Sequence, residues 1–206
     1  MKTFGEIAFT RAVQAAQERD GSRDAYARVA DASRRPAGLG SAEADFLRAT
    51  DSFYLATVSE TGWPYVQHRG GPPGFLKVVS PTRIAFADFR GNRQLVSVGN
   101  VSRDDRASMI VVDYVNRRRL KLLGHLSFAD LGEADPELVF EVELPDYPAR
   151  VERVAVFDVA AFDWNCPQHI TPRFTEAQIR TAVQPLHDRI AELEAKLASL
   201  GAKVSS

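Results

Sequence analysis

Two cations stand on either side of a short loop that is rich in glycine and proline. Arg69 ends a run of alternating residues, and Lys77 comes shortly after the loop Gly70-Gly71-Pro72-Pro73-Gly74. Glycine allows a ligand to approach the backbone closely, and two cations can hold a phosphate group through charge-assisted hydrogen bonds. The same composition also suits a long hairpin loop with two solvated cations, so this segment alone leaves both interpretations open.

A second candidate anion site lies in the segment Phe86–Gln94, which runs from a strand into a turn at Gly91-Asn92. We expect a short helix over 93–100 directly after this turn. Free backbone N–H groups at a helix start, the positive end of the helix dipole and the side chain of Arg93 would together attract an anion. The alternative is an ordinary Asx or glycine turn with Arg90 and Arg93 on the surface.

The third candidate segment, Asp163–Phe174, gathers an aromatic ring, a thiol, an amide, an imidazole and a guanidinium around two prolines. Ordering such a loop costs conformational entropy, which favours a functional role. Cys166 and His169 are candidates for a nucleophile or a metal pair, but no second histidine or acid stands at ligand spacing. We therefore expect no metal site, and His169 is the candidate for proton transfer.

A run of three arginines at 117–119 marks the tip of an expected hairpin. Most such runs are solvated turns. Arg119 lies nearest the following strand and is an additional candidate for contact with a ligand. His68 and His125 fall within expected strands, where a hydrogen-bonded structural histidine is the more common role.

The elements that must position these segments change in type at residue 53, where a helical pattern gives way to alternation. Turn signals such as Ser59-Glu60-Thr61-Gly62 separate short strands, which predicts a β-barrel or sandwich. Helices are expected over 8–19 and over 42–49, the second with Ser41 as its N-cap. The segment Glu137–Glu143 fits either helix or strand. The expected strands are Phe53–Val58, Tyr65–Arg69, Phe75–Val79, Arg83–Ala87, Ser108–Val115, Leu120–Phe128 and Arg150–Phe162.

The C-terminal segment has the pattern of a long amphipathic helix. Thr175-Glu176-Ala177-Gln178 is a capping box. Pro185 lies inside the pattern, where we expect a kink or a fresh helix start. The helix could pack on its own barrel or pair with a second chain. The 4-3 spacing typical of a coiled coil is kept by Ile179, Val183, Leu186, Ile190, Leu193, Leu197 and Leu200.

Composition limits the classes of protein that fit this chain of 206 residues. The net charge of −1 gives no global field that would attract nucleic acid or an anionic membrane. No apolar run approaches the length of a membrane span and no signal peptide is evident, so we expect a cytoplasmic protein. The single cysteine is consistent with a reducing compartment. We expect an N-terminal helical extension over 1–40, a barrel over 41–174 and a C-terminal helix over 175–206.

Together the three segments resemble the pyridoxamine 5′-phosphate oxidase-like family of FMN-binding split barrels, and most of all its bacterial branch of FMN-binding proteins. The similarity runs from about Phe46 to Phe174 and rests on the order of the segments and the strands between them. The resemblance implies a mainly β split barrel with flanking helices. It also implies a homodimer, with FMN lying in the groove between the two barrels.

The resemblance also assigns residues to the cofactor. The Arg69 and Leu76-Lys77 strands would face flavin and phosphate, the Asn92–Gln94 turn would grip the phosphate, and the loop with Trp164 and His169 would reach the flavin from the partner. The residues expected to contact FMN are Gln67, His68, Arg69, Phe75, Leu76, Lys77, Ala87, Asp88, Asn92, Arg93, Gln94, Arg119, Trp164 and Gln168.

The sequence departs from the vitamin B6 enzyme of this family. Where that enzyme's phosphate turn has Ser-Arg-Lys, this chain has Gly91-Asn92-Arg93, and Gly70–Gly74 separates its arginine from Leu76-Lys77. No Arg-Leu-His segment for the B6 substrate is recognisable. FMN binding is therefore expected and pyridoxamine phosphate oxidation is not.

Two further features bear on the expected function. A phosphate near charge −2 needs cations and N–H donors, which these segments contain, and no Gly-x-Gly-x-x-Gly follows a strand, which argues against a dinucleotide fold. The expected function is an FMN-dependent oxidoreductase for a small molecule, reduced by a donor such as NADH or NADPH. The alternatives are a flavin carrier or redox sensor, and a split barrel that binds haem or a deazaflavin.

Overall fold

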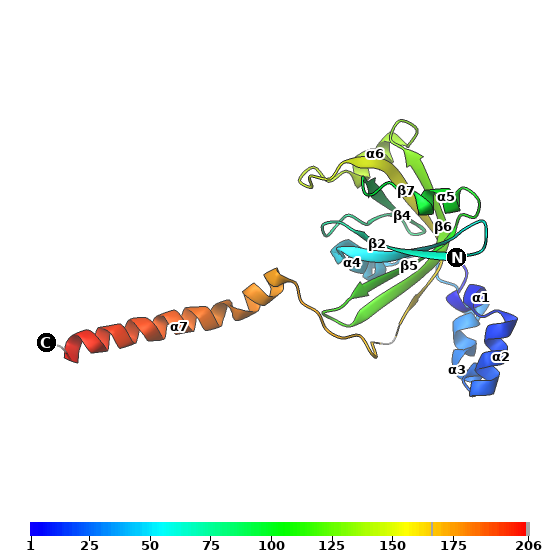
Figure 1. The fold of residues 1–206 in the computed structure, drawn as a ribbon. Coiled ribbons are helices and arrows are strands. Elements are labelled where there is room, and N and C mark those ends of the chain that lie inside the picture. The colour runs from blue at the N-terminus through cyan, green and yellow to red at the C-terminus, as the bar shows by residue number, and fades with distance from the viewer. Residues whose placement is uncertain (166, 205–206) are drawn as a thin grey trace.

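Seven antiparallel strands form one curled sheet in the computed structural model, which describes residues 1–165 and 167–204 (Figure 1). The strand order is β2-β1-β5-β6-β7-β4-β3, so β2 and β3 are the two edges. This confirms the mainly β fold with flanking helices. The strands are β1 (Ser52–Val58), β2 (Pro64–Gly70), β3 (Lys77–Ser80), β4 (Arg83–Phe89), β5 (Arg106–Asp113), β6 (Arg118–Asp130) and β7 (Val151–Trp164).

Alternating residues of these strands fill the inside of the barrel. Phe53 lies at the centre, where its ring stacks on Phe75 at a centroid distance of 5.9 Å and meets Phe86 edge-on at 5.2 Å. Because side chains alternate across a strand, every second residue of β1, β5, β6 and β7 turns into this core. Its largest members include Leu55, Met109, Leu122, Leu126 and Phe157.

A smaller apolar cluster covers the outer face of β4 and β7. Helix α6 (Pro136–Val142) lies over these strands (Figure 1), and its Val142 packs with Ala85, Ala87 and Val154. The Asp135 side chain accepts the backbone N–H of Glu137, and proline occupies the first turn. The segment Glu137–Glu143, which fitted either helix or strand, therefore forms a helix. Its apolar side chains bury the outer face of β4 and β7.

The N-terminal region consists of three short α-helices beside the barrel, and the second of them lies where the helix over 8–19 was expected. Thr3 caps the first of them and Thr10 caps the second, so the chain starts a new helix at Arg11. The helices are α1 (Phe4–Ala8), α2 (Arg11–Asp20) and α3 (Arg23–Ala27), followed by the 3₁₀ turns η1 (Arg28–Ala30) and η2 (Ala32–Arg34).

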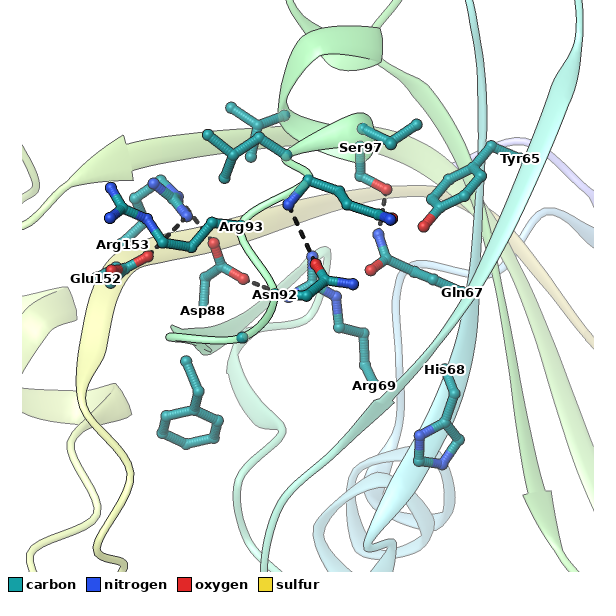
Figure 2. Close-up of a pocket in the computed structure, with 16 residues that line it drawn as sticks. Tyr65, Gln67, His68, Arg69, Asp88, Asn92, Arg93, Ser97, Glu152 and Arg153 are labelled. Atoms are coloured by element: carbon teal, nitrogen blue, oxygen red, sulfur yellow. Dashed lines mark hydrogen bonds and ion pairs between the residues drawn. The ribbon is translucent and has the colours of Figure 1, made fainter.

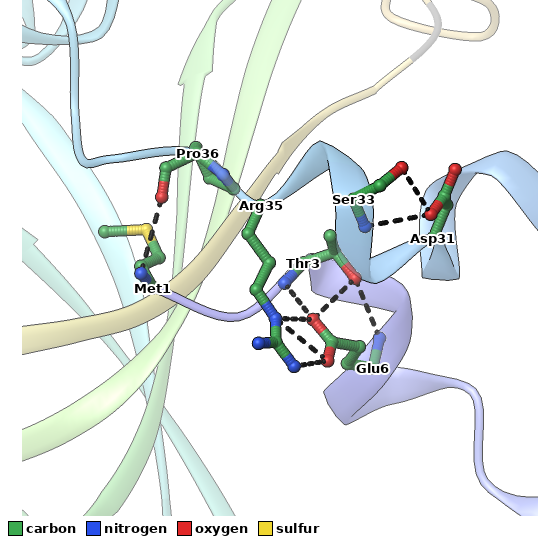
Figure 3. A network of polar contacts seen from close by, with 7 residues as sticks. All are labelled: Met1, Thr3, Glu6, Asp31, Ser33, Arg35 and Pro36. Carbon is green, nitrogen blue, oxygen red and sulfur yellow. Dashed lines mark hydrogen bonds and ion pairs between the residues drawn. The ribbon is translucent and has the colours of Figure 1, made fainter.

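Glu6 ties the two ends of this region together (Figure 3). Its carboxylate accepts hydrogen bonds from the Nε of Arg35 at 3.0 Å and from the backbone N–H of Thr3 at 2.8 Å. These contacts, the Arg35 hydrogen bond above all, lower the pKa of Glu6 to about 2. The ion pair between Glu6 and Arg35 thus joins residues that are far apart in the sequence. It stabilises an N-terminal region that has little apolar core.

Two short helices flank the first half of the barrel. Helix α4 (Ser41–Ala49) has Gly40 as its N-cap, so Ser41 is the first helical residue and not the cap. The Glu43 side chain accepts the backbone N–H of Gly40 at 2.9 Å, which fulfils the capping role. Helix α5 (Val96–Val101) starts later than the helix expected over 93–100, because Arg93 and Leu95 adopt left-handed backbone angles.

The C-terminal helix α7 (Glu176–Val204) extends away from the barrel (Figure 1). The predicted capping box is confirmed: Thr175 and Gln178 exchange backbone-to-side-chain hydrogen bonds of 2.9 and 3.3 Å. The helix continues through Pro185, so a fresh helix start there is wrong. In the part of the chain that the structure covers, no helix combines the length and apolar character that crossing a membrane requires.

Candidate functional site

A cavity of about 260 Å³ lies where the two ends of the sheet approach each other (Figure 2). Strand β2 is one edge of the sheet and β4 lies next to the other edge, and no ladder of the described strands joins them. The first two candidate segments meet in this cavity, which we call the split cavity. The predicted residues that line it are Gln67, His68, Arg69, Asp88, Asn92, Arg93 and Gln94.

Alternate side chains of strand β2 face the split cavity. Gln67 and Arg69 are half-buried, whereas Val66 and His68, on either side of Gln67, are exposed. Gln67 is held in place because its Nε2 donates a hydrogen bond to the hydroxyl of Ser97 at the start of α5. The strand therefore presents one amide and one guanidinium to the cavity.

Asp88 is the buried charge at the centre of the site. Its Oδ1 accepts a hydrogen bond from Nη1 of Arg69, and its Oδ2 accepts one from Nε of Arg153 at 2.8 Å. A buried carboxylate is expensive unless it is paired and hydrogen-bonded. Two guanidinium groups meet that requirement, so Asp88 orients both arginines at the wall of the cavity.

Two donors at the cavity still lack acceptors. The Nε of Arg69 is buried and has no hydrogen-bond partner in the described part of the chain. Arg93 is exposed, and no ion pair or hydrogen bond among residues 1–165 and 167–204 engages its side chain. A buried N–H without an acceptor costs free energy, whereas the exposed guanidinium of Arg93 is free to bind an anionic ligand in the cavity.

The loop between β4 and α5 has an unusual backbone. Arg93 and Leu95 have φ values of 60° and 56°, in a region that costs non-glycine residues about 1–3 kcal/mol. The Oδ1 of Asn92 accepts the backbone N–H of Gln94 at 3.1 Å, which closes an Asx turn. Since α5 has only six residues and starts after this turn, the loop and the arginines, rather than a helix start, form the candidate anion site.

Seven expected ligand contacts do not line the split cavity, and four of them belong to the barrel core, β3 or β4. Phe75 and Leu76 are only 2% and 1% exposed and belong to the barrel core. Lys77 pairs with Ala85 across β3 and β4, and Ala85 and Ala87 are packed under α6. Paired residues share one face of a sheet, so Lys77 and Ala87 lie on the face opposite Asp88. Of the two cations that flank the Gly70–Gly74 loop, the structure therefore places Arg69, but not Lys77, at the split cavity.

The third candidate segment begins with a tryptophan that is anchored on its own chain. The Nε1 of Trp164 donates to Oε1 of Glu43 at 2.7 Å. Its ring meets Phe46 edge-on at 4.8 Å, and the guanidinium of Arg118 lies 4.6 Å from the ring centroid. Within one chain, Trp164 therefore fixes α4 to the end of β7 and does not reach the split cavity.

His169 and Arg119 line a second cavity of about 220 Å³, on the outer face of β5 and β6. Tyr114 and Arg173 also line it, with the Arg173 guanidinium 4.8 Å from the ring centroid of Tyr114. A hydrogen bond with Tyr54 and partial burial raise the pKa of Tyr114 above its usual value. Gln168 is exposed in the same loop, and Cys166 lies outside the described residues.

The sequence interpretation missed Arg153, which lines the split cavity together with Glu152. Arg153 stands directly opposite Asp88 in the β4–β7 ladder. The available signal was two charged residues at the start of a strand that otherwise alternates valine and alanine. Their partner could not be named without the pairing of β4 with β7.

An open antiparallel barrel with a cationic cavity at its split defines a split-barrel protein with a candidate anion site. The family model described as pyridoxamine 5′-phosphate oxidase matches residues 39–163, more than half of the chain. The protein therefore belongs to the pyridoxamine 5′-phosphate oxidase family, which confirms the family resemblance without identifying the chain as the B6 enzyme.

The solved structures that resemble this chain are distant in sequence. An FMN-binding protein from Syntrophomonas wolfei is 17% identical, with a TM-score of 0.45, over 60% of this chain and 84% of that one. A Clostridium acetobutylicum protein related to general stress protein 26 is 14% identical (TM-score 0.41, 65% and 92% covered). An F420 reductase is 22% identical (TM-score 0.39, 57% and 93% covered). Comparison with the curated proteins gives no match.

Proposed function

We propose that this protein is an FMN-binding oxidoreductase that acts on a small molecule and holds its cofactor at a homodimer interface. The family match and the FMN-binding structural relative support a flavin-binding, oxidoreductase-type function. The observation that carries the finer proposal is the pair of arginines that line the split cavity, Arg69 and Arg93, of which Arg93 has a free, exposed guanidinium.

The charges of the split cavity suit a phosphate monoester. Three arginines line it, and the carboxylates of Asp88 and Glu152 leave one net positive charge. A phosphate monoester carries roughly −1.5 to −2 charges at neutral pH and has three acceptor oxygens. In this arrangement the guanidinium groups of Arg93 and Arg69 bind phosphate oxygens, while Asp88 keeps that of Arg69 in position.

The size of the split cavity favours a site completed by a second chain. Cavities for whole cofactors or drug-sized ligands usually measure about 300–1,000 Å³, and this one measures about 260 Å³. It suits the phosphate and the chain next to it, so the flavin ring would extend past the edge strand β2. Bound there, the flavin would supply the capacity to accept and release electrons, and Gln67 would offer it an amide contact.

An exposed apolar sheet face lies next to that edge. Tyr54 pairs with His68 and Ile110, and Ala56 pairs with Val66, so their side chains share the outer face of β2, β1 and β5. Tyr54 and Val66 are exposed. Exposed apolar patches of this kind mark interfaces. Pairing of two such faces would form the homodimer and bring His169 of the second cavity close to the other chain.

The roles proposed for the chain's own residues follow from these positions. Arg93, Arg69 and the Asn92 turn bind the phosphate, and Arg153 holds Asp88 in place. His169, on a loop of the second cavity, moves a proton to or from the substrate. Trp164 shapes the end of β7 beneath that loop. NADH, NADPH or a small organic substrate is the proposed electron donor.

Absorbance and mass spectrometry of the purified protein test the proposal. We expect a yellow protein with flavin bands that releases FMN on denaturation. Release of only FAD, haem or a deazaflavin, or no affinity for any of them, would overturn FMN as the cofactor. A protein that binds FMN at full strength while sedimenting as a monomer would overturn the shared site.

A further inference from the structure

The outward face of α7 carries an apolar stripe that its own chain leaves uncovered. The helix extends away from the barrel (Figure 1), and Leu197, for example, is 68% exposed. Single exposed apolar residues are ordinary, but a contiguous stripe indicates a partner. The exposed members of the stripe are Ile179, Leu186, Ile190, Leu193, Leu197 and Leu200. The possibility that this seam packs on its own barrel is therefore excluded in this structure.

We infer that α7 pairs with α7 of a second copy as a parallel, two-stranded coiled coil. The 4-3 spacing places Val183, Ile190 and Leu197 at heptad position a, and Ile179, Leu186, Leu193 and Leu200 at position d. Branched Val and Ile at a with Leu at d favour parallel dimers over trimers and tetramers. Pro185 falls at position c, on the outer side of the helix, so it does not enter the seam.

The charges beside the seam fit the parallel orientation. Arg189 lies at position g and Glu194 at the following e position, which is the pair that meets between parallel helices. Arg189 now contacts Glu192 of its own helix at 2.6 Å. Glu194 makes no ion pair or hydrogen bond among the described residues, so its carboxylate is available to Arg189 of the second copy.

An antiparallel pairing places like charges together. In such a coil, g positions face g positions and e positions face e positions. Of the two registers that overlap most, one brings Arg189 against itself, and the other brings Arg189 against Lys196 and Glu194 against itself. Like charges at these positions destabilise a coil and opposite charges select the partner and its orientation.

The length of α7 suits a helix pair that strengthens a dimer to which the barrels also contribute, rather than an independent dimerisation domain. Its 29 residues span about 43 Å at 1.5 Å per residue. About three heptads is a short coiled coil, so the barrels must contribute to association. Parallel helices start at the same end, which places both barrels together and agrees with twofold symmetry. The inference concerns α7 alone and holds whether or not the split cavity binds FMN.

Disulfide trapping in the full-length chain tests both the pairing and its direction. With Cys166→Ser as background, Leu200→Cys places one thiol at a d position near the end of the helix. We expect mild oxidation to join most chains into covalent dimers, and Ile190→Asp in the same background to slow this roughly tenfold or more by burying a charge in the seam. No covalent dimer would overturn the coiled coil.

A mixed sample distinguishes the orientations. Ile179→Cys and Leu197→Cys chains, combined in the same background, would cross-link with each other at speed only in an antiparallel coil. We expect this product to form far more slowly than the Leu200→Cys dimer. The opposite order would overturn the parallel arrangement.

The charge pair has its own matched control. Glu194→Lys opposes Arg189 of the second copy, whereas Asp188→Lys makes the same charge change at position f, away from the seam. We expect Glu194→Lys to slow Leu200→Cys cross-linking roughly threefold to tenfold and Asp188→Lys to leave it unchanged. Adding Arg189→Glu to Glu194→Lys should restore the rate. Equal effects of the two lysine variants, or failure of the restoration, would overturn the role of the Arg189–Glu194 pair.

Discussion

Arg69 and Asp88 form a buried ion pair between β2 and β4, two strands that no sheet ladder connects. Strand β2 is one edge of the sheet and β4 lies beside the other edge. The pair thus links the two ends of the open barrel by side chains instead of backbone hydrogen bonds. Arg153 completes the link from β7. The same groups that hold the barrel together form the wall of the split cavity.

The role of Asp88 can be measured as stability. Asp88→Asn removes the negative charge that Arg69 and Arg153 share, and leaves two mostly buried guanidinium groups without their carboxylate. Breaking a buried ion pair in this way costs about 3–5 kcal/mol. Arg153 keeps Glu152 within 3.4 Å, so we expect the lower end of that range. Urea unfolding of both proteins measures the change in free energy of unfolding.

The matched control is Asp158→Asn. Asp158 also accepts a hydrogen bond from an arginine, Arg83, at 2.7 Å, but both side chains are about half exposed. Exposed pairs contribute at most about 1 kcal/mol. If the two variants lose the same stability, Asp88 is not the link that joins the two ends of the sheet.

Arg93 is expected to act on the phosphate of the cofactor. Arg93→Ala should weaken FMN binding by about 1.5–3 kcal/mol through loss of a charge-assisted hydrogen bond. Riboflavin, which lacks the phosphate, should bind the variant almost as well as the native protein. Titration of the apoprotein with both ligands, followed by flavin fluorescence, gives the two affinities.

Two nearby cations serve as controls for Arg93. Arg90 is exposed, approaches Glu152 at 3.6 Å and does not line the split cavity. Lys77 lies on the opposite face of the sheet, beside Ala85. Arg90→Ala and Lys77→Ala should change FMN affinity little. Equal losses for Lys77→Ala and Arg93→Ala would restore the sequence-based expectation that Lys77 holds the phosphate.

The strands and the first two site segments were predictable from sequence because both depend on local patterns. Alternation marks a strand wherever it lies, and Gln67, Arg69, Asp88 and Arg93 stand in short recognisable segments. Side chains alternate between the two faces of a strand, so a shift of one residue in the start of the alternation moves Lys77 to the other face. Phe75 and Leu76 are both buried before β3 begins, so the expected strand Phe75–Val79 placed Lys77 on the wrong face.

Other parts of the site were outside the reach of sequence reasoning because they depend on contacts between distant segments. Arg153 joins the site through its place opposite Asp88 in the β4–β7 ladder. Trp164 is directed toward α4 by Glu43 and Phe46. Neither contact can be recognised in the local sequence pattern, because each partner has the pattern of an ordinary strand or helix residue.

The N-terminal helices provide a test by pH. The pKa of Glu6 is lowered to about 2, mainly by its hydrogen bond with Arg35. A carboxyl with a depressed pKa in the folded state stabilises that state above its ordinary pKa, and this contribution is lost as the pH falls through the folded value. The Glu6–Arg35 contact should therefore persist at pH 4 and disappear near pH 2.

Carboxyl NMR titration measures this directly. We expect a midpoint for Glu6 far below 4.5 in the native protein and a return toward the ordinary value in Arg35→Ala. The neighbouring hydrogen bond from Thr3 should keep the variant's midpoint somewhat low. A native midpoint near the ordinary value would show that Arg35 and Glu6 do not form this contact in solution.

The last prediction concerns catalysis and rests on the proposed function. His169 lines the second cavity and does not line the split cavity, where the phosphate is proposed to bind. If it moves a proton for the reaction, His169→Ala should slow reduction of bound FMN by NADH, NADPH or a small organic donor, by about 10²–10⁴-fold. FMN affinity should stay the same. Single-turnover stopped-flow mixing measures the rate, and fluorescence titration measures the affinity.

Two comparisons make this result interpretable. His125, which contacts Asp105 at 2.8 Å and does not line the cavity of His169, gives a histidine control: His125→Ala should leave both quantities unchanged. Trp164→Ala is a poorer probe, because its contacts with Glu43 and Phe46 make it part of the fold. If a broad panel of donors leaves the flavin of the native protein oxidised while dithionite reduces it, the flavin-carrier or sensor alternative replaces the enzyme. If reduction occurs at the same rate in native protein and His169→Ala, the proton must come from another group, and the oxidoreductase proposal stands without His169.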